Sequence, residues 1–299
     1  MAVAAVLMIR SSVALILNDE REDFFIMAIN LAEKYSTKID EKFKLGAVTT
    51  PAVNNDYSFE GVKTVKVYSI PTTALGDYTR SGANRYGTPK ELEDSLQELT
   101  LARDRAFTFT IDKGNLTDQL MLKEAGKALA RQIDEQVIPE IDIYRLSKIA
   151  AGAGTTSTAA AITEKNAYSA LLDGQAALTD AKAPLGGRIA YVTPAFYKAI
   201  KLDSTFVKAS DIAQDMLVKG QVGMVDGVAI IVVPSSYMPT NTDFIITHPV
   251  ACCAPIKLAE YKIHDNPPGI NGALVEGRIY YDAFILANKA AAIYKHIHA

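Results

Sequence analysis

The sequence predicts an α+β protein with two domains. Three observations lead to this prediction: a long helical periodicity over residues 115–148, alternating strand patterns before it, and a mixed succession of helix and strand signals from Lys165 onward. The length of 299 residues is also near the size at which chains divide into two domains. The predicted order is a leader, a strand region, a long helix and a compact α/β domain.

The composition favours self-association and argues against a module that reads nucleic acid. Hydrophobic residues make up 49% of the chain and charged residues 22%, which indicates apolar surface that another chain covers. The net charge is -3, and the lysines and arginines are spread along the chain without the basic stripe that tight phosphate binding needs. We therefore expect no sequence-specific contact with DNA.

The first 43 residues predict a leader followed by a helix. Residues 1–17 are apolar, but their first charge, Arg10, lies inside the apolar stretch and no small-residue cleavage site follows, which argues against a signal peptide. Neither apolar run is long enough to span a bilayer, so we expect no membrane association. Residues 22–43 carry an apolar stripe at helical spacing and predict an amphipathic helix.

Two strand runs follow, with a long connection between them. Val65 and Val67 alternate with polar residues in the first run, as do three apolar residues in the second, Phe107, Phe109 and Ile111. We expect the two runs to pair antiparallel. The connection, from about residue 71 to residue 96, is far longer than a hairpin loop, and its centre DYTRSGANRYGTPKELED has no aliphatic residue larger than Ala83 before Lys90. It predicts a protruding arm.

The longest helical signal covers residues 115–148. Its apolar positions recur at helical spacing, and Asn115 or Thr117 can cap its first turn. About 34 residues at 1.5 Å each would span roughly 50 Å, more than the diameter of a small domain. Pro139 has no amide hydrogen and crowds the carbonyl one turn earlier, so we expect a kink or break near Val137.

The second domain is predicted from a regular alternation of elements. Residues 150–160, AAGAGTTSTAA, lack the lysine of a phosphate-binding loop and follow a helix, so a flexible linker is the better interpretation. The expected helices cover residues 166–178, 194–202 and 211–218, and the expected strands cover residues 188–192, 228–233, 244–247, 277–287 and 291–297.

Residues that carry chemistry do not gather into a recognisable catalytic or metal site. The chain has no nucleophile elbow, zinc-binding HExxH motif or dinucleotide-binding glycine motif. His296 and His298 alternate in a predicted strand, but two ligands make no closed metal site. The neighbouring Cys252 and Cys253 are interpreted as two buried, small hydrophobic side chains in a reducing compartment. His264 lies beside a Pro-Pro-Gly turn, where a structural role is favoured.

Several segments together carry a family resemblance. Those of the arm and long helix read VNNDYSFEGVKTVKVYSIPT, DYTRSGANRYGTP, RAFTFTIDKGN and KALARQIDEQVIPEIDIYRLSKIA, and those of the second domain read RIAYVTPAFYKAI, VDGVAIIVVPSSYMP and DFIITHPVACCAPIK. In this order they resemble the major capsid proteins of tailed bacteriophages, of the kind found in phages of Gram-positive bacteria. The resemblance covers residues 17–297 and rests on segment order more than on one motif.

The resemblance implies a capsid fold with four parts. These are an N-terminal arm and helix (1–54), an extended β-hairpin loop (55–112), a peripheral domain built on a spine helix (113–165, completed by strands from about 255–285), and a mixed α/β axial domain (166–254, completed by about 286–299). Residues 1–16 depart from the pattern, and their origin as a native arm, a precursor remnant or an added segment stays open.

The implied function is structural. Copies of the chain would assemble into pentamers and hexamers of an icosahedral head that encloses double-stranded DNA, with no catalysis and no cofactor. The implied partners are the chain itself, a scaffolding protein, a portal and a decoration protein, and the implied location is the virion capsid, assembled in the host bacterial cytoplasm. Two alternatives stay open: an encapsulin-like nanocompartment shell, which shares the fold, and a soluble α/β enzyme that uses residues 165–256.

Within this interpretation, the arm contacts a neighbouring subunit and the helix bends. The expected contact residues are Tyr78, Arg80, Arg85, Tyr86, Glu91, Glu93 and Asp94. The arginines would pair with carboxylates, while the tyrosines would supply rigid contact area. Pro139 is the expected hinge.

Overall fold

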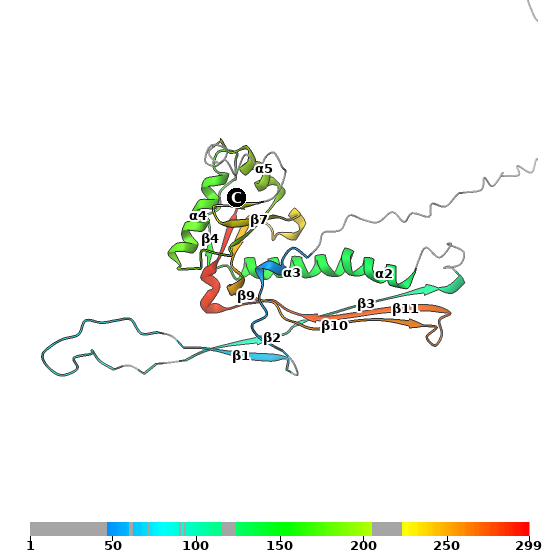
Figure 1. Cartoon of the computed structure of the whole chain (residues 1–299), viewed down its shortest axis with the longest axis horizontal. Coiled ribbons are helices and arrows are strands. Elements are labelled where there is room, and N and C mark those ends of the chain that lie inside the picture. The colour runs from blue at the N-terminus through cyan, green and yellow to red at the C-terminus, as the bar shows by residue number, and fades with distance from the viewer. Residues whose placement is uncertain are drawn as a thin grey trace, which may run out of the picture. The chain divides into compact units, whose positions relative to one another are not determined.

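The computed structural model describes residues 47–59, 62–70, 72–89, 91–92, 94–114, 124–204 and 223–298 (Figure 1). The leader, the predicted helices over 22–43 and 211–218, the first turns of the predicted helix over 115–148, and the predicted contact residue Glu93 lie outside these ranges. No helix in the described ranges is both long and apolar enough to cross a membrane.

A mixed six-stranded sheet forms the centre of the axial domain. Its strand order is β4 (Thr155–Thr156), β13 (Ile293–Ile297), β8 (Thr242–Thr247), β5 (Ile189–Val192), β7 (Val228–Val232) and β6 (Met224–Val225). The pairs β4–β13 and β5–β7 are parallel and the other pairs are antiparallel. The predicted strands over 188–192, 228–233, 244–247 and 291–297 are therefore confirmed to within a few residues.

The sheet is buried on both faces, which explains why its strands read as continuous apolar runs. In β5, Ala190 and Val192 face one core with α4 (Ala167–Asp180) and α5 (Pro194–Leu202), while Ile189 and Tyr191 face a second core. The N-terminus of α5 is capped by the Thr193 hydroxyl, which accepts from the Phe196 amide. Both predicted helices are confirmed.

The spine helix is built in three stretches. The α-helix α2 (Ala125–Gln132) passes into the π-helical segment η2 (Ile133–Val137) and then into α3 (Ile138–Ala151), whose second residue is Pro139. The Ile138 amide donates to the Ile133 carbonyl, five residues back. Because Pro139 has no amide hydrogen to offer the carbonyl of Glu135, regular α-helical bonding cannot continue through this point. The irregularity predicted near Val137 is present as this π-helical segment.

A three-stranded antiparallel sheet accompanies the spine helix, in the order β10 (Ile256–Asp265), β11 (Gly272–Tyr281) and β3 (Arg103–Asp112) (Figure 1). Ile279 and Tyr281 of β11 pack on Ile141 of α3. Gly277 leaves room for two aromatic rings, because a Cβ there would lie 2.3 Å from Phe107 and 2.9 Å from Tyr261. The turn after β10 has Asn266 and Gly269 at positive φ, as a Pro-Pro-Gly turn predicts.

The predicted pairing of the first two strand runs is wrong. The run at Val65 belongs to β1 (Thr64–Ser69), which pairs with β2 (Ser95–Thr100), whereas the run at Phe107 belongs to β3 and pairs with β11. The polar sequence SLQELT gave no strand signal, so β2 was missed. Since β2 closes the arm, β3 is free to join the sheet beside the spine helix.

The predicted flexible linker over residues 150–160 is also wrong in part. The Gly154 amide donates to the Ala290 carbonyl, Thr155 and Thr156 form β4, and the Ser157 amide donates to Lys295. The segment is an edge of the axial sheet because Gly154 allows an approach to Ala290 that a Cβ would block at 2.6 Å.

Short elements complete the described chain. They are the 3₁₀ turns η1 (Thr50–Ala52), η3 (Ser235–Tyr237), η4 (Pro249–Ala251) and η5 (Ala287–Ala292), and a two-stranded pair of β9 (Cys252–Cys253) with β12 (Phe284–Ile285). Cys252 and Cys253 are both buried and unbridged, which confirms their interpretation as small core residues.

Candidate assembly surfaces

The arm, residues 70–94, connects β1 and β2 and forms its own turn at the tip. The Thr79 amide donates to the Arg85 carbonyl at 3.1 Å, and the Gly87 amide donates to the Asn84 carbonyl at 2.9 Å. Arg85 donates from Nε to the carbonyl of Gly82, at 3.2 Å. Gly82, Asn84 and Gly87 all have positive φ, which glycine and asparagine tolerate best. The tip is therefore shaped by contacts within its own backbone.

The structure brings two of the predicted contact residues together, and the other described ones do not pair with each other. Tyr78 and Tyr86 make an edge contact with ring centroids 4.9 Å apart, although Tyr86 is 92% exposed. Arg80, Glu91 and Asp94 are exposed, and no ion pair joins them to another side chain in the described residues. Their charges are thus available to a second molecule.

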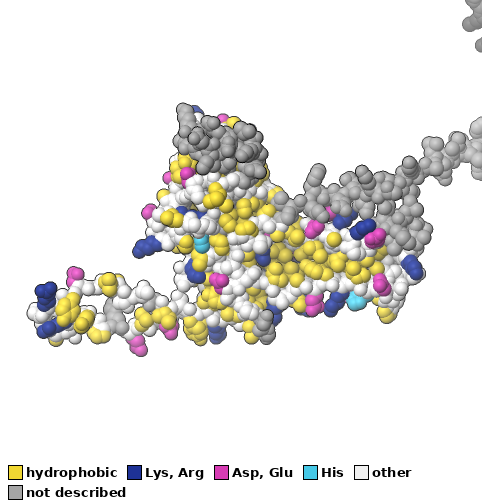
Figure 2. Space-filling model, viewed as in Figure 1, with side chains coloured by type: hydrophobic (Ala, Val, Ile, Leu, Met, Phe, Trp, Pro, Cys, Tyr) yellow, Lys and Arg dark blue, Asp and Glu magenta, His cyan; other side chains and the backbone are white. Residues whose placement is uncertain are grey.

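Sequence reasoning missed an apolar row that flanks the polar tip. Five exposed apolar side chains lie on β1, on β2 and on the two legs of the arm: Tyr68, Ile70, Leu75, Leu92 and Leu96. Leu75 is fully exposed and Ile70 is 67% exposed. Figure 2 shows hydrophobic side chains along the arm. The signal was present in the sequence as isolated apolar residues on either side of the glycine-rich tip. Side chains of this kind on one hairpin are typical of a surface that another chain covers.

The base of the arm is fixed to the body of the protein. Leu99 and Leu101 are buried with Phe59 and Leu286, and Phe59 stacks on Phe284 with ring centroids 5.7 Å apart. The Gln97 side chain bridges to the segment at β12, since it donates to the Ile285 carbonyl and accepts from the Ala287 amide. The arm therefore projects from a rigid support.

A cluster of charges joins β3 to the spine helix beside Pro139. Glu140 accepts from Arg103 at 3.0 Å and from Arg105 at 2.7 Å, and the Arg103 guanidinium lies 4.6 Å from the centre of the Tyr144 ring. Tyr144 donates to Asp282, and burial raises the pKa of its hydroxyl. These contacts hold α3 on the sheet directly after the π-helical segment.

The strap, residues 47–55, is bound to α3 by a buried carboxylate. Asp142 is 1% exposed and accepts from the Val48 amide at 3.0 Å, from the Thr49 amide at 3.3 Å and from the Thr49 hydroxyl. On the other side, Tyr191 donates to the Val48 carbonyl at 2.9 Å. The strap therefore connects the spine helix with the axial sheet.

His296 of β13 and His298, which follows the strand, both contact one carboxylate. His296 and His298 each place Nδ1 3.1 Å from Asp243, one on each carboxylate oxygen. Within the described ranges, no group of three or more histidine, cysteine, aspartate or glutamate side chains is arranged to hold a metal ion.

The spine helix on its three-stranded sheet, the arm and the mixed axial sheet together define the fold of a tailed-phage major capsid protein. The chain is similar to "Mycobacterium phage Che8", with a TM-score of 0.68, 17% identity and coverage of 89% of this chain and 97% of that one. It is similar to "Capsid structure of the Cyanophage P-SCSP1u", with a TM-score of 0.68, 13% identity and coverage of 91% and 93%. For "Asymmetric unit of bacteriophage PhiM1 mature capsid" the TM-score is 0.69, with 12% identity and coverage of 89% and 91%.

The family itself follows from the sequence profile. The profile described as "Phage capsid protein" matches residues 98–296, which is more than half of the chain. The chain belongs to the phage capsid protein family, so it is a structural protein and not an enzyme. No curated protein matches it significantly.

Proposed function

We propose that copies of this chain assemble into rings of five and of six that close into an icosahedral head around double-stranded DNA. The observation that carries the proposal is the arm, which exposes an apolar row on a hairpin that has no core of its own. One heterologous contact, repeated between identical chains, generates closed rings. The proposed location is the capsid of the virion, assembled in the host bacterial cytoplasm.

In this proposal the arm lies over a neighbouring copy. Tyr78 and Tyr86 contribute rigid aromatic area, and Arg80 pairs with a carboxylate of the neighbour. Arg85 contributes less than the sequence predicts, because its Nε already binds the tip of the arm. Each exposed ion pair is worth only about 0–1 kcal/mol, but a closed lattice repeats it in every copy.

The proposal extends to partners beyond the chain itself. A scaffolding protein, a portal and a decoration protein would complete the head, and DNA would be enclosed without sequence-specific contact. The lysines and arginines are spread along the chain and the net charge is -3, which supports a protein that encloses DNA and does not recognise its sequence.

Electron microscopy of the purified recombinant chain tests the proposal. We expect shells, tubes or sheets of hexamers at high protein concentration. A chain that stays in discrete small oligomers, with or without added scaffolding protein, would contradict it. Particles isolated from infected cells should contain DNA, whereas a protein cargo would favour a nanocompartment.

A further inference from the structure

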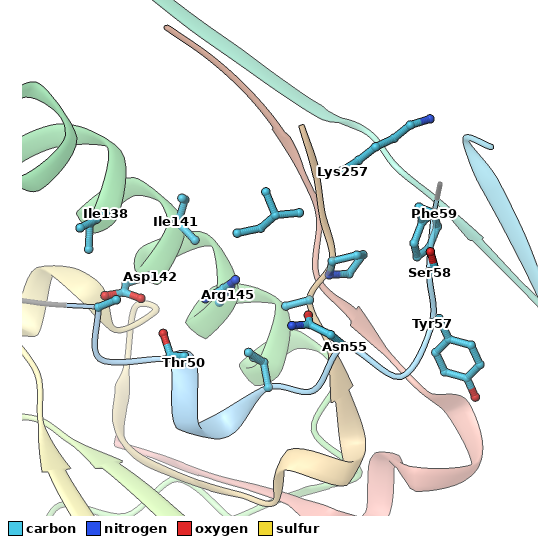
Figure 3. A pocket seen from close by; sticks show the side chains of 15 residues that line it. Thr50, Asn55, Tyr57, Ser58, Phe59, Ile138, Ile141, Asp142, Arg145 and Lys257 are labelled. Atoms are coloured by element: carbon cyan, nitrogen blue, oxygen red, sulfur yellow. The ribbon is translucent and has the colours of Figure 1, made fainter. Parts of the chain in front are cut away.

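One cavity of the described chain has a buried cation in its wall. The cavity measures about 700 Å³ and lies between the strap, the start of α3 and the start of β10 (Figure 3). Thr50, Asn55 and Ser58 lie on its exposed side, and Ile138 and Ile141 form part of its apolar wall. The cavity is therefore accessible from outside and mixed in polarity.

Arg145 is the residue that gives this cavity a specific chemistry. Its side chain is only 6% exposed, yet among the described residues the guanidinium makes a single hydrogen bond, from Nη1 to the Thr49 hydroxyl at 3.4 Å. Its buried Nε has no partner. Asp142 lies one turn away on the same helix, but its oxygens are occupied by the strap. A buried guanidinium is costly unless charged oxygens bind it.

A second cation lies at the same cavity. Lys257 is a lining residue, and its Nζ donates to the Val62 carbonyl at 2.8 Å, which is a neutral acceptor. Among the described lining residues, two positive groups and one occupied carboxylate leave an excess of positive charge. A ligand with a carboxylate and an apolar flank matches this combination of charge and wall.

The arm of another copy carries this chemistry. Glu91 and Asp94 are exposed and form no ion pair within the described residues, and Leu92 between them is 51% exposed. Glu91 and Asp94 thus present carboxylates near an apolar side chain. Within one chain, neither Glu91 nor Asp94 forms an ion pair with Arg145 or Lys257. The carboxylates of the arm can therefore pair with these positive groups only between two copies.

We propose that this cavity is a carboxylate-binding site that receives the segment around Glu91 and Asp94 from the arm of a neighbouring copy. The proposal rests on the proposed function, because it requires assembled copies. It adds the receiving surface, which is built from the strap and α3, and it gives Arg145 its missing partner. Arg80, at the tip of the arm, takes no part in this cavity contact and is the residue proposed above to pair with a carboxylate of the neighbour.

Disulfide trapping between singly substituted chains tests the contact. Chains with Ser58→Cys and chains with Glu91→Cys are mixed, assembled and oxidised, and then separated under non-reducing conditions. We expect a dimer band only from the mixture, because the natural cysteines are buried. Asp77→Cys, an exposed acidic position on the outgoing leg of the arm, is the matched control and should give no dimer with Ser58→Cys.

A second measurement tests the charge. Arg145→Met and the pair Glu91→Gln with Asp94→Asn should each raise the subunit concentration needed for particles by roughly 10- to 100-fold. Combining them should add little further, because both remove the same interaction. Lys148→Met, on the exposed side of α3, should change that concentration less than about threefold. Independent, multiplicative effects of the two sets of changes would overturn the proposal.

The results separate this inference from the proposed function. If the unchanged chain forms no particles, the proposed function fails. If particles form but Ser58→Cys and Glu91→Cys give no dimer, the cavity proposal fails alone. A disulfide between Ser58→Cys and Glu41→Cys within one chain would assign the cavity to the segment that precedes the strap, and would also overturn the proposal.

Discussion

Replacing Asp142 should release the strap from the spine helix. The carboxylate is 1% exposed and accepts from two backbone amides and one hydroxyl, all within Val48 and Thr49. Asp142→Ala leaves these three donors without an acceptor and also removes the negative charge nearest to Arg145. Breaking a buried charged contact of this kind costs about 3–5 kcal/mol, a large part of the total stability of a domain.

Two milder variants should lose progressively less stability than Asp142→Ala. Asp142→Asn keeps one acceptor oxygen but places an amide donor opposite other donors, so we expect a loss of about 1–3 kcal/mol. Thr49→Val removes one hydroxyl and keeps both backbone amides bonded, so about 1 kcal/mol should be lost. Asp180→Ala, at an exposed position, is the control and should change stability by less than about 0.5 kcal/mol.

Two measurements on the unassembled subunit check this order. Urea unfolding followed by circular dichroism gives the free energy of unfolding, and the near-ultraviolet tyrosine signal includes a contribution from Tyr191, which bonds the strap. Hydrogen exchange at the Val48 and Thr49 amides should accelerate in the order of the expected losses. If Asp142→Ala changes neither stability nor exchange at these amides, the carboxylate does not hold the strap.

Three further predictions concern the arm, the spine helix and the axial core. Deleting residues 79–88 and closing the gap with a short glycine-serine link should leave a soluble subunit with near-native circular dichroism but no closed shells, because in the described part of the chain the backbone hydrogen bonds of the tip stay within the tip; unfolding of the subunit would contradict this. Pro139→Ala should permit regular α-helical bonding through the π-helical segment and change the particle size distribution seen by microscopy, while unchanged particles at unchanged yield would argue against a hinge there. Gly174→Ala should lower stability by up to about 2 kcal/mol, because the added Cβ would lie 2.8 Å from Ile246 and overpacking outweighs the better helix propensity. Gly126→Ala, which meets no atom within 4 Å, should lose nothing and serves as its control in the same urea titration.

The sequence predicted best those elements whose local residue pattern matches their burial in the fold. The helix over residues 194–202 has Pro194 at its first position and a threonine cap before it, and the structure has these same bounds. The strand run at Ile189 is apolar throughout because both faces of the axial sheet are covered. In these segments the local pattern and the tertiary environment agree.

The elements missed depend on partners far away in the chain. Strand β2 reads SLQELT, in which polar residues interrupt any apolar alternation. It exists because β1 pairs with it, and no local pattern specifies that pairing. Strands from about 255–285, the range that includes β10, were expected only from the family resemblance. The binding of the strap to Asp142 was missed for the same reason, since the two are more than 90 residues apart in sequence.

The exposure of the described candidate contact residues was predicted but their geometry was not, and their contact with a second copy stays a prediction. The exposed tyrosines and arginines of the arm were found from composition alone, whereas the backbone contact of Arg85 and the closed tip follow from positive φ angles at Gly82 and Asn84. Arg145 gave no signal, because an arginine in a helical periodicity is expected on the solvent side.

The position of β13 in the axial sheet has a consequence for synthesis on the ribosome. This strand lies between β4 and β8, so the sheet cannot be completed until Ile293–Ile297 has been made. At about 5–20 residues per second, the ribosome needs roughly 2–9 s to travel from Thr247, the end of β8, to Ile293, and during that time β8 has β5 on one side but lacks β13 on the other. A nascent chain also lacks Tyr294, on which α4 packs at Gly174. Copies of the chain can therefore assemble through a completed axial domain only after residues 293–297 have been synthesised.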